Sequence, residues 1–122
     1  MNKVILCFDL DNTISTTKKN FYKSSKPKKK VIKIINSLHN EGYYIKIFTS
    51  RFMGRSNENI LKAKQRGYNF TKQQLKKWGL SYDKLIFGKP SYDLFVDDKS
   101  LGFKKNWPKT FRNFLKYDFK KN

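Results

Sequence analysis

The chain has very few of the residues that form disulfides or histidine metal sites: one cysteine and one histidine in 122 residues. A lone Cys7 cannot close an internal disulfide, which excludes the disulfide-rich class of small secreted proteins. We expect Cys7 to be a small hydrophobe in the core, in a reducing compartment. His39 has no second histidine with which to bind a metal, so we expect it at the surface.

Long apolar runs are also missing from the sequence. No run reaches the length of a transmembrane helix. The short apolar stretch at residues 4–8 leads into acidic residues, unlike a secretory signal. A chain of this length can bury a single core. We therefore expect a cytoplasmic protein with no membrane partner and one domain over residues 1–122.

Acidic residues are scarce, because 28 lysines and arginines face nine aspartates and glutamates, for a net charge of +19. A surface this basic attracts molecules that carry phosphate. The sequence has no clear arginine-rich patch and no stacking platform of the kind that binds single strands. We expect the charge to attract an anionic substrate without forming a specific nucleic-acid site.

The first candidate site follows the apolar run at residues 4–8, which predicts a strand buried on both faces. The run ends in Asp9-Leu10-Asp11-Asn12-Thr13. Asp9 and Asp11 are two residues apart, so both carboxylates point the same way in an extended chain. Such carboxylates repel each other unless a cation or donor lies between them. A ligand site and an ordinary acidic turn are the two readings of this stretch alone.

The rest of the sequence alternates helical and strand patterns. The patterns predict a flap, either loop or short hairpin, at 14–30, helices at 28–42, 57–66 and 71–78, strands at 43–48, 85–87 and 94–96, and a helical tail at 108–122. Glycines at 42, 67 and 79 are expected to end the three helices. With right-handed crossovers this order predicts an α/β protein with a three-layer, Rossmann-like, mostly parallel sheet.

Polar residues follow every predicted strand. Thr49-Ser50-Arg51 follows the second strand, Lys89 the third, and Asp97-Asp98 the fourth. Because parallel strands end at one edge of a sheet, we expect these residues to meet Asp9 and Asp11 there.

This ordered set resembles the four motifs of the haloacid dehalogenase (HAD) superfamily of phosphohydrolases. The motifs are DxDxT at residues 9–13, a threonine that ends a strand at Thr49, a lysine at Lys89, and the acidic pair Asp97-Asp98. The stretches FTSRFMGRSNENI and GKPSYDLFVDDKS are also similar to small bacterial HAD phosphatases linked to capsule and surface-polysaccharide biosynthesis.

The resemblance implies a catalytic role for four residues. Asp9 would attack phosphorus and form an aspartyl-phosphate. Asp11 would protonate the leaving oxygen and then deprotonate the attacking water. Thr49 and Lys89 would hold the phosphoryl oxygens. The substrate would be a small phosphorylated metabolite such as a sugar phosphate.

The resemblance also implies a Mg²⁺ cofactor in a site made of oxygen ligands. Its ligands would be Asp9, the backbone carbonyl of Asp11 and Asp97. Asp98 would bind through water or orient Lys89.

HAD enzymes often select substrate with a cap domain inserted after the first motif or between the second and third. Here residues 14–42 and 52–88 are filled by elements that the sheet needs, so no cap domain is expected. Substrate selection then falls to Ser50, Arg51 and Arg55, and the open site would be covered only by the flap or by a partner in a homo-oligomer.

Two other functions remain open from the sequence. The net charge and the open site favour a polynucleotide end phosphatase. A catalytically silent HAD-like binding protein is the second alternative, although every expected catalytic position is filled.

Overall fold

The computed structural model of the protein describes residues 3–113 and 115, and the chain divides into two compact units. The first unit spans Met1–Ser91 and the second Tyr92–Asn122. The first contains β1 (Ile5–Asp9), β2 (Ser15–Thr16), the 3₁₀ turn η1 (Tyr22–Ser24), β3 (Lys26–Pro27), α1 (Lys29–Asn40), β4 (Tyr44–Thr49), the 3₁₀ turn η2 (Gly54–Ser56), α2 (Ile60–Lys77) and β5 (Lys84–Phe87). The second contains α3 (Trp107–Asn113).

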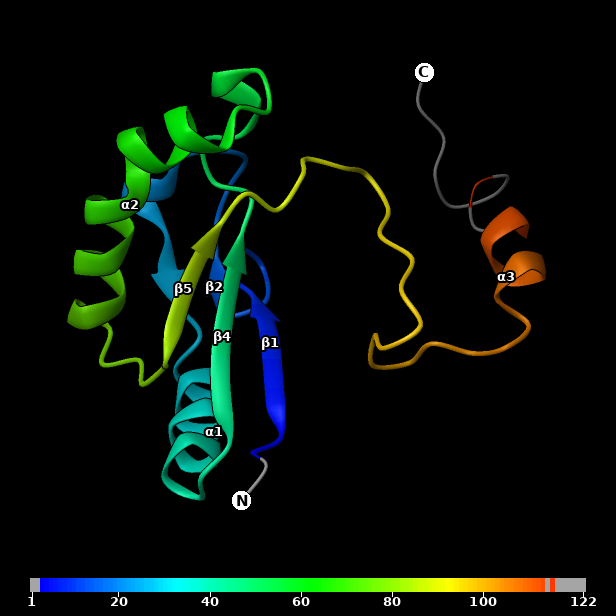
Figure 1. Ribbon diagram of the computed structural model, residues 1–122, viewed down its shortest axis with the longest axis horizontal. Coiled ribbons are helices and arrows are strands. Elements are labelled where there is room, and N and C mark those ends of the chain that lie inside the picture. The colour runs from blue at the N-terminus through cyan, green and yellow to red at the C-terminus, as the bar shows by residue number, and fades with distance from the viewer. Residues whose placement is uncertain (1–2, 114, 116–122) are drawn as a thin grey trace. The chain divides into compact units, whose positions relative to one another are not determined.

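The first unit is built on a parallel three-stranded sheet in the order β1-β4-β5 (Figure 1). Phe8 lies opposite Ile47, and Ile47 lies opposite Leu85. The helices α1 and α2 make the two crossovers between consecutive strands. The expected α/β class with a parallel sheet is therefore confirmed.

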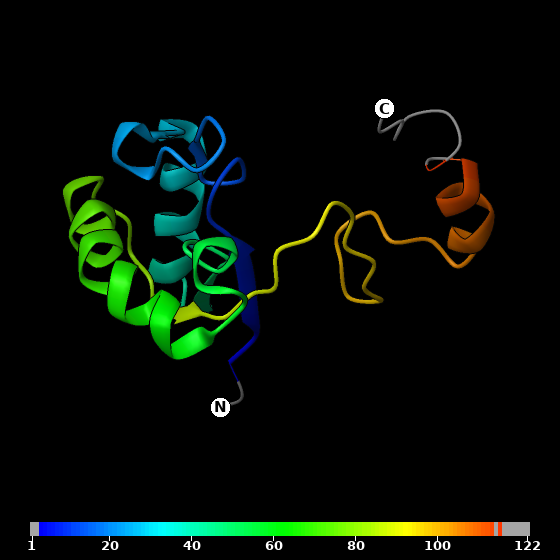
Figure 2. The ribbon, with the colours of Figure 1, turned by 90° about the horizontal axis from the view of Figure 1, so that it is seen from above.

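One face of the sheet carries the core of this unit. Ile45, Ile47 and Leu85 form the buried row, and they pack with Ile35 of α1 and Leu75 of α2. Seen along the strands, both helices lie on the same side of the sheet (Figure 2). The strands β4 and β5 thus bury alternate residues, as expected when a helical layer covers a single face, whereas no residue of β1 is fully buried.

The opposite face of β1 is not covered by other elements of the first unit. The prediction that β1 is buried on both faces is wrong, because Ile5 is 58% exposed. Cys7, two residues further on the same face, is exposed as well, which contradicts the expected core position. Within residues 3–91 no helix covers this face, so a third layer stays a prediction.

The two predicted helices at 57–66 and 71–78 are one continuous helix, α2. Gly67 was expected to end a helix but lies buried inside it, because the ring of Phe52 packs where a side chain at this position would start. Asn59 caps the helix, and its side chain accepts the N–H of Lys62 at 3.0 Å. Thr71 is fully buried in the interior of the helix.

The predicted flap contains a short antiparallel hairpin made of β2 and β3. Ser15 pairs with Pro27, and the N–H of Lys28 donates to the carbonyl of Ile14 at 2.9 Å. The hairpin leads directly into α1 and so holds residues 15–27 over the end of β1.

The second unit contains one helix and a loop among its described residues. The predicted strand at 94–96 is not formed, because it has no strand partner among the residues that the structure describes. The predicted tail at 108–122 begins within α3, whereas residues 114 and 116–122 lie outside the described part of the chain. No helix of the described chain is long and apolar enough to span a membrane.

Asp83 connects three elements at the opposite edge of the sheet, just before β5. Its Oδ2 accepts the N–H of Ile45 in β4 at 2.8 Å, and its own N–H donates to the carbonyl of Ile45 at 2.8 Å. Its Oδ1 lies 3.3 Å from Nε2 of His39 in α1. The hydrogen bond from Ile45, with a smaller effect of His39, holds the pKa of Asp83 below its usual value of 3.8.

We expect Asp83→Asn to lower the free energy of unfolding at neutral pH by about 0.5–1 kcal/mol, because the negative charge that strengthens these contacts is lost at a solvent-exposed site. The pKa of Asp83 is lowered by folding, so its stabilisation is complete above pH 3.8 and is lost as pH falls through the folded pKa. Urea unfolding at neutral and acidic pH measures this. If the free energies of unfolding of the wild type and Asp83→Asn differed by the same amount at every pH, the stabilising role of the Asp83 carboxylate would be contradicted.

Candidate functional site

Three of the four predicted site elements meet at the carboxyl edge of the sheet. The strands end at Asp9, Thr49 and Phe87: Thr49 pairs with Phe87, and Asp9 pairs with Phe48, one residue before Thr49. The N–H of Lys89 then donates to the carbonyl of Thr49 at 3.2 Å, which fixes the chain after β5 beside the end of β4. The topology therefore brings Asp9, Thr49 and Lys89 together, as the sequence predicts.

Asp9 is held between a hydroxyl and a cation. Oγ1 of Thr13 donates to its Oδ2 at 3.0 Å, and Nζ of Lys89 donates to its Oδ1 at 3.2 Å. Lys89 is only 7% exposed, whereas the side chain of Asp9 is 31% exposed. The carboxylate thus stays accessible to a ligand while a nearly buried ammonium lies next to it.

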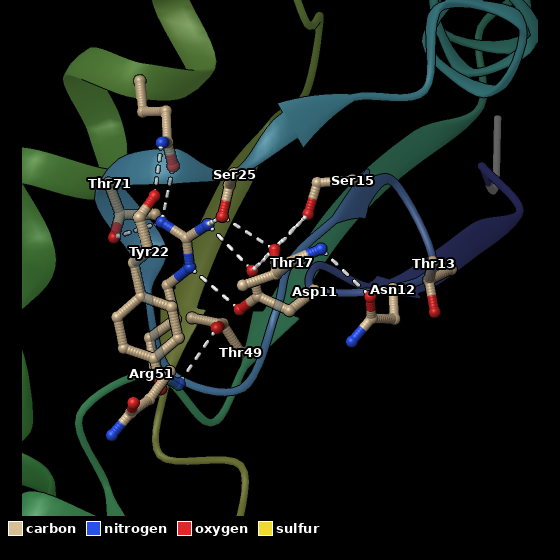
Figure 3. Close-up of polar contacts among 12 residues, drawn as sticks. Asp11, Asn12, Thr13, Ser15, Thr17, Tyr22, Ser25, Thr49, Arg51 and Thr71 are labelled. Carbon is tan, nitrogen blue, oxygen red and sulfur yellow. Dashed lines mark hydrogen bonds and ion pairs between the residues drawn. The ribbon is translucent and has the colours of Figure 1, made fainter.

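Asp11 faces a different cation, the guanidinium of Arg51 (Figure 3). Nε of Arg51 donates to Oδ2 of Asp11 at 2.9 Å, and Nη2 donates to Oδ1 at 2.9 Å. This is a bidentate pair, the strongest geometry available to an arginine and a carboxylate. The two carboxylates of the DxDxT motif are therefore separated, and each has its own cation.

Arg51 is fully buried and is surrounded by polar and aromatic groups. Its Nη1 donates to Oε1 of Gln74 at 2.6 Å and to Oγ1 of Thr71 at 3.3 Å, both on α2. Its Nη2 also donates to Oγ of Ser25 in the flap at 3.3 Å. The guanidinium carbon lies 4.8 Å from the centre of the Tyr22 ring, within range of a cation–π interaction.

The flap supplies further partners to Asp11. Oγ1 of Thr17 donates to Oδ1 of Asp11 at 2.6 Å, and it also lies 2.7 Å from Oγ of Ser25. The N–H of Thr17 donates to the side-chain oxygen of Asn12 at 3.0 Å (Figure 3). Asp11 is therefore the point at which the DxDxT loop, the flap and α2 are joined.

Thr49 shapes the turn that carries Arg51. Its Oγ1 accepts the N–H of Arg51 at 3.1 Å, and it is almost completely buried. The carbonyl of Ser50 accepts the N–H of Met53 at 3.1 Å, which continues the turn. In this arrangement Thr49 lies at the strand end where a phosphoryl group was predicted.

Arg51 and Arg55 were predicted to contact the leaving group. Arg51 is instead wholly engaged with Asp11, the flap and α2. Nη2 of Arg55 donates to the carbonyl of Asn20 at 2.8 Å, and its guanidinium lies 5.4 Å from the centre of the Tyr22 ring. Arg55 is exposed and contacts the flap. Of the two arginines, it is the one that remains accessible to a substrate.

The predicted Mg²⁺ ligands are divided between the two units. Asp9 and Asp11 belong to the first, whereas Asp97 and Asp98 belong to the second. Among the described residues, no three side chains of His, Cys, Asp or Glu lie together as a metal cluster. Asp9 and the backbone carbonyl of Asp11 are hard oxygen donors that suit Mg²⁺, and the remaining predicted ligand, Asp97, belongs to the second unit.

The partners of Arg51 in α2 and the flap were not predicted as site residues. Ser25 and Thr17 lie in the predicted flap at 14–30, and Gln74 lies in the predicted helix at 71–78. The available signal was Arg51 itself, one of very few arginines in a lysine-rich chain, placed directly after a strand. An arginine that directly follows a buried strand is expected to pair with a carboxylate, and Asp11 follows the neighbouring strand β1.

Comparison with known proteins gives a match to the fold. No protein-family model matches the sequence, and no curated protein matches it significantly. A crystal structure of an MCSG target protein from Vibrio cholerae has a TM-score of 0.74 and 24% sequence identity. The match covers 93% of this chain and 98% of the other. The two proteins therefore share a fold.

We expect Arg51→Met to lower the free energy of unfolding by about 3–5 kcal/mol, because it leaves Asp11 without its buried counter-charge. The matched control is Arg55→Met, which removes an exposed arginine and should cost about 1 kcal/mol or less. Urea unfolding of both variants measures the difference. Equal losses would show that the Arg51–Asp11 pair contributes no more than a surface contact.

Proposed function

We propose that the protein is a Mg²⁺-dependent phosphomonoesterase of the HAD type that acts on a small phosphorylated metabolite. The observation that supports this most is the position of Asp9, accessible at the carboxyl edge of a parallel sheet beside the nearly buried Lys89. A carboxylate next to an ammonium can attack a phosphorus atom while the cation binds the phosphoryl oxygens. The three-layer, capless core of that superfamily is part of the proposal.

Asp9 is proposed as the nucleophile. One of its oxygens forms a bond to phosphorus as the bond from phosphorus to the leaving oxygen breaks, which gives an aspartyl-phosphate and an alcohol. Water then attacks the aspartyl-phosphate, and inorganic phosphate and the free carboxylate of Asp9 are released. Thr13, which already donates to Oδ2, keeps the other oxygen of Asp9 oriented during both steps.

Lys89 and Thr49 are proposed to bind the phosphoryl group. Nζ of Lys89 lies 3.2 Å from Asp9, so a phosphate in contact with Asp9 also comes within its reach. Mg²⁺, when bound, would supply charge neutralisation at the phosphoryl oxygens. Asp9 and the backbone carbonyl of Asp11 would hold it, together with an acidic residue of the pair Asp97-Asp98.

Asp11 is proposed to transfer protons to the leaving oxygen and from the attacking water. In the present arrangement both of its oxygens accept from Arg51, and Oδ1 also accepts from Thr17. Proton transfer by Asp11 therefore competes with these hydrogen bonds for its oxygens. Substitution of Asp11 tests this role separately from that of Asp9.

The wild-type protein is expected to release phosphate from p-nitrophenyl phosphate with Mg²⁺ and to lose this activity in excess EDTA. Asp9→Asn should lower kcat by at least about 1,000-fold, because an amide cannot act as the nucleophile. Thr13→Val is a matched control that keeps the nucleophile and removes only its hydrogen bond. Full turnover by Asp9→Asn would show that another residue attacks phosphorus.

The substrate class is tested with the same protein and a panel of sugar phosphates, nucleotides and oligonucleotides phosphorylated at the 3′ or 5′ end. The proposal expects the highest kcat/KM on a small phosphorylated metabolite. A preference for oligonucleotide ends that persists at physiological salt would establish the polynucleotide phosphatase instead, because non-specific attraction is screened there. Absence of turnover on every substrate would favour the silent binding protein.

We expect Asp11→Asn to slow an alkyl phosphate about 100-fold and p-nitrophenyl phosphate about 10-fold or less, as expected for loss of a general acid. The difference arises because p-nitrophenolate leaves without a proton, whereas an alkoxide requires one. Single-turnover release of the leaving group, p-nitrophenolate or the alcohol, measures formation of the aspartyl-phosphate. Equal losses on the two substrates would mean that Asp11 acts only through its structural contact with Arg51.

A further inference from the structure

The free edge of β1 is an apolar surface that a further strand would cover. In the described chain β1 pairs only with β4, on one side. Val4, just before this strand, and Ile5, its first residue, are 59% and 58% exposed. Cys7 is exposed on the same face as Ile5. An edge strand that is exposed and hydrophobic tends to pair with another strand.

The second unit contains a segment suited to this edge. Leu94-Phe95-Val96 is apolar and has high strand propensity, and it forms no strand among the described residues. Val96 is 44% exposed, and Leu101 is completely exposed. A unit of about thirty residues cannot bury a core of its own. Its apolar residues therefore need the surface of another unit.

A strand at 94–96 that runs parallel to β1 would end at the edge that carries Asp9. The acidic pair Asp97-Asp98 follows immediately. Its carboxylates would then lie at the same sheet edge as Asp9 and would complete the proposed Mg²⁺ ligand set.

The linker is short for a connection within one chain. Only residues 88–93 separate the end of β5 from Leu94, whereas a connection between parallel strands of one sheet takes a dozen or more residues. The β5 strand is at the opposite edge of the sheet, so the linker would have to cross about 14 Å to reach the far side of β1. The N–H of Ser91 donates to Oε1 of Glu58 at 2.8 Å, so the crossing falls to the chain from Ser91 to Leu94, which spans at most about 11 Å. A connection this short favours exchange between copies.

We propose that two copies of the chain exchange their carboxy-terminal units, so that Leu94–Val96 of each copy extends the sheet of the other at the free edge of β1. Each site is then completed by the acidic pair of the second copy. The exchange rests on the free edge, the apolar segment and the short linker. Its role in completing the site rests also on the phosphatase function proposed above.

The first test is independent of activity. Val96→Cys adds a second thiol to the native Cys7, and a short bismaleimide is used to join the two. Exchange predicts a covalent dimer in which peptide mapping finds Cys7 joined to the introduced thiol. The same link within a single chain would overturn the exchange, and so would no link for Val96→Cys, Leu94→Cys and Phe95→Cys alike. The control Cys7→Ser/Val96→Cys should lose this cross-linked peptide.

The molar mass of the unmodified protein keeps the proposal testable if the cysteine variants fail to fold. Light scattering at physiological salt is expected to give the mass of two chains. A monomer at all concentrations up to about 100 μM would overturn the proposal, since an exchanged pair must be a dimer.

The second test joins the exchange to the activity. Asp9→Asn and the double variant Asp97→Asn/Asp98→Asn are each expected to be inactive, and they are mixed, unfolded and refolded together. An exchanged heterodimer has one intact site, because it combines Asp9 of one copy with the acidic pair of the other. About a quarter of wild-type activity should return with random pairing. A dimer that cross-links but shows no wild-type activity would disprove the function and leave the exchange standing, whereas an active wild type without recovery on mixing would exclude a shared site.

Discussion

The ion pair between Arg51 and Asp11 is the interaction on which the arrangement of the site depends. Arg51 is fully buried, and a buried charge without its partner costs several kcal/mol. Its fork therefore fixes the loop after β1 to the turn after β4 and, through Gln74, to α2. Ser25 of the flap is attached to the same guanidinium. One cation thus determines where four separate segments of the chain lie.

Asp9 and Asp11 pair with different cations, so the two aspartates of DxDxT differ in how accessible they are to a ligand. Both oxygens of Asp11 are occupied by a guanidinium that is closed to solvent. Asp9 has a single ammonium at one oxygen and a hydroxyl at the other, and it is partly open to solvent. A ligand can therefore reach Asp9 without breaking the scaffold that Asp11 holds. This difference in environment is consistent with a nucleophile at Asp9.

The sequence correctly predicted helices and strands whose position depends on local pattern. It failed for features that depend on tertiary packing. The alternation of apolar runs and helical stripes placed the parallel strands and α1. The prediction that Gly67 ends a helix was wrong, because a glycine inside a helix can also allow close packing, here against Phe52. Likewise, the run before Asp9 reads as buried on both faces, whereas Ile5 is exposed. The partners of Arg51 come from segments far apart in the sequence, and no local pattern joins them.

The chain after β5 shows how one half of the site can form without the other. The N–H of Lys89 is bound to the carbonyl of Thr49, and the N–H of Ser91 donates to Oε1 of Glu58 at 2.8 Å. These bonds fix both ends of the segment 89–91 within the first unit, so the position of Lys89 does not depend on where the second unit docks. The proposed phosphate-binding half is therefore already assembled in the first unit. The acidic pair lies beyond this anchor, so its arrival is a separate event, and assembly would then control whether a bound phosphate can react.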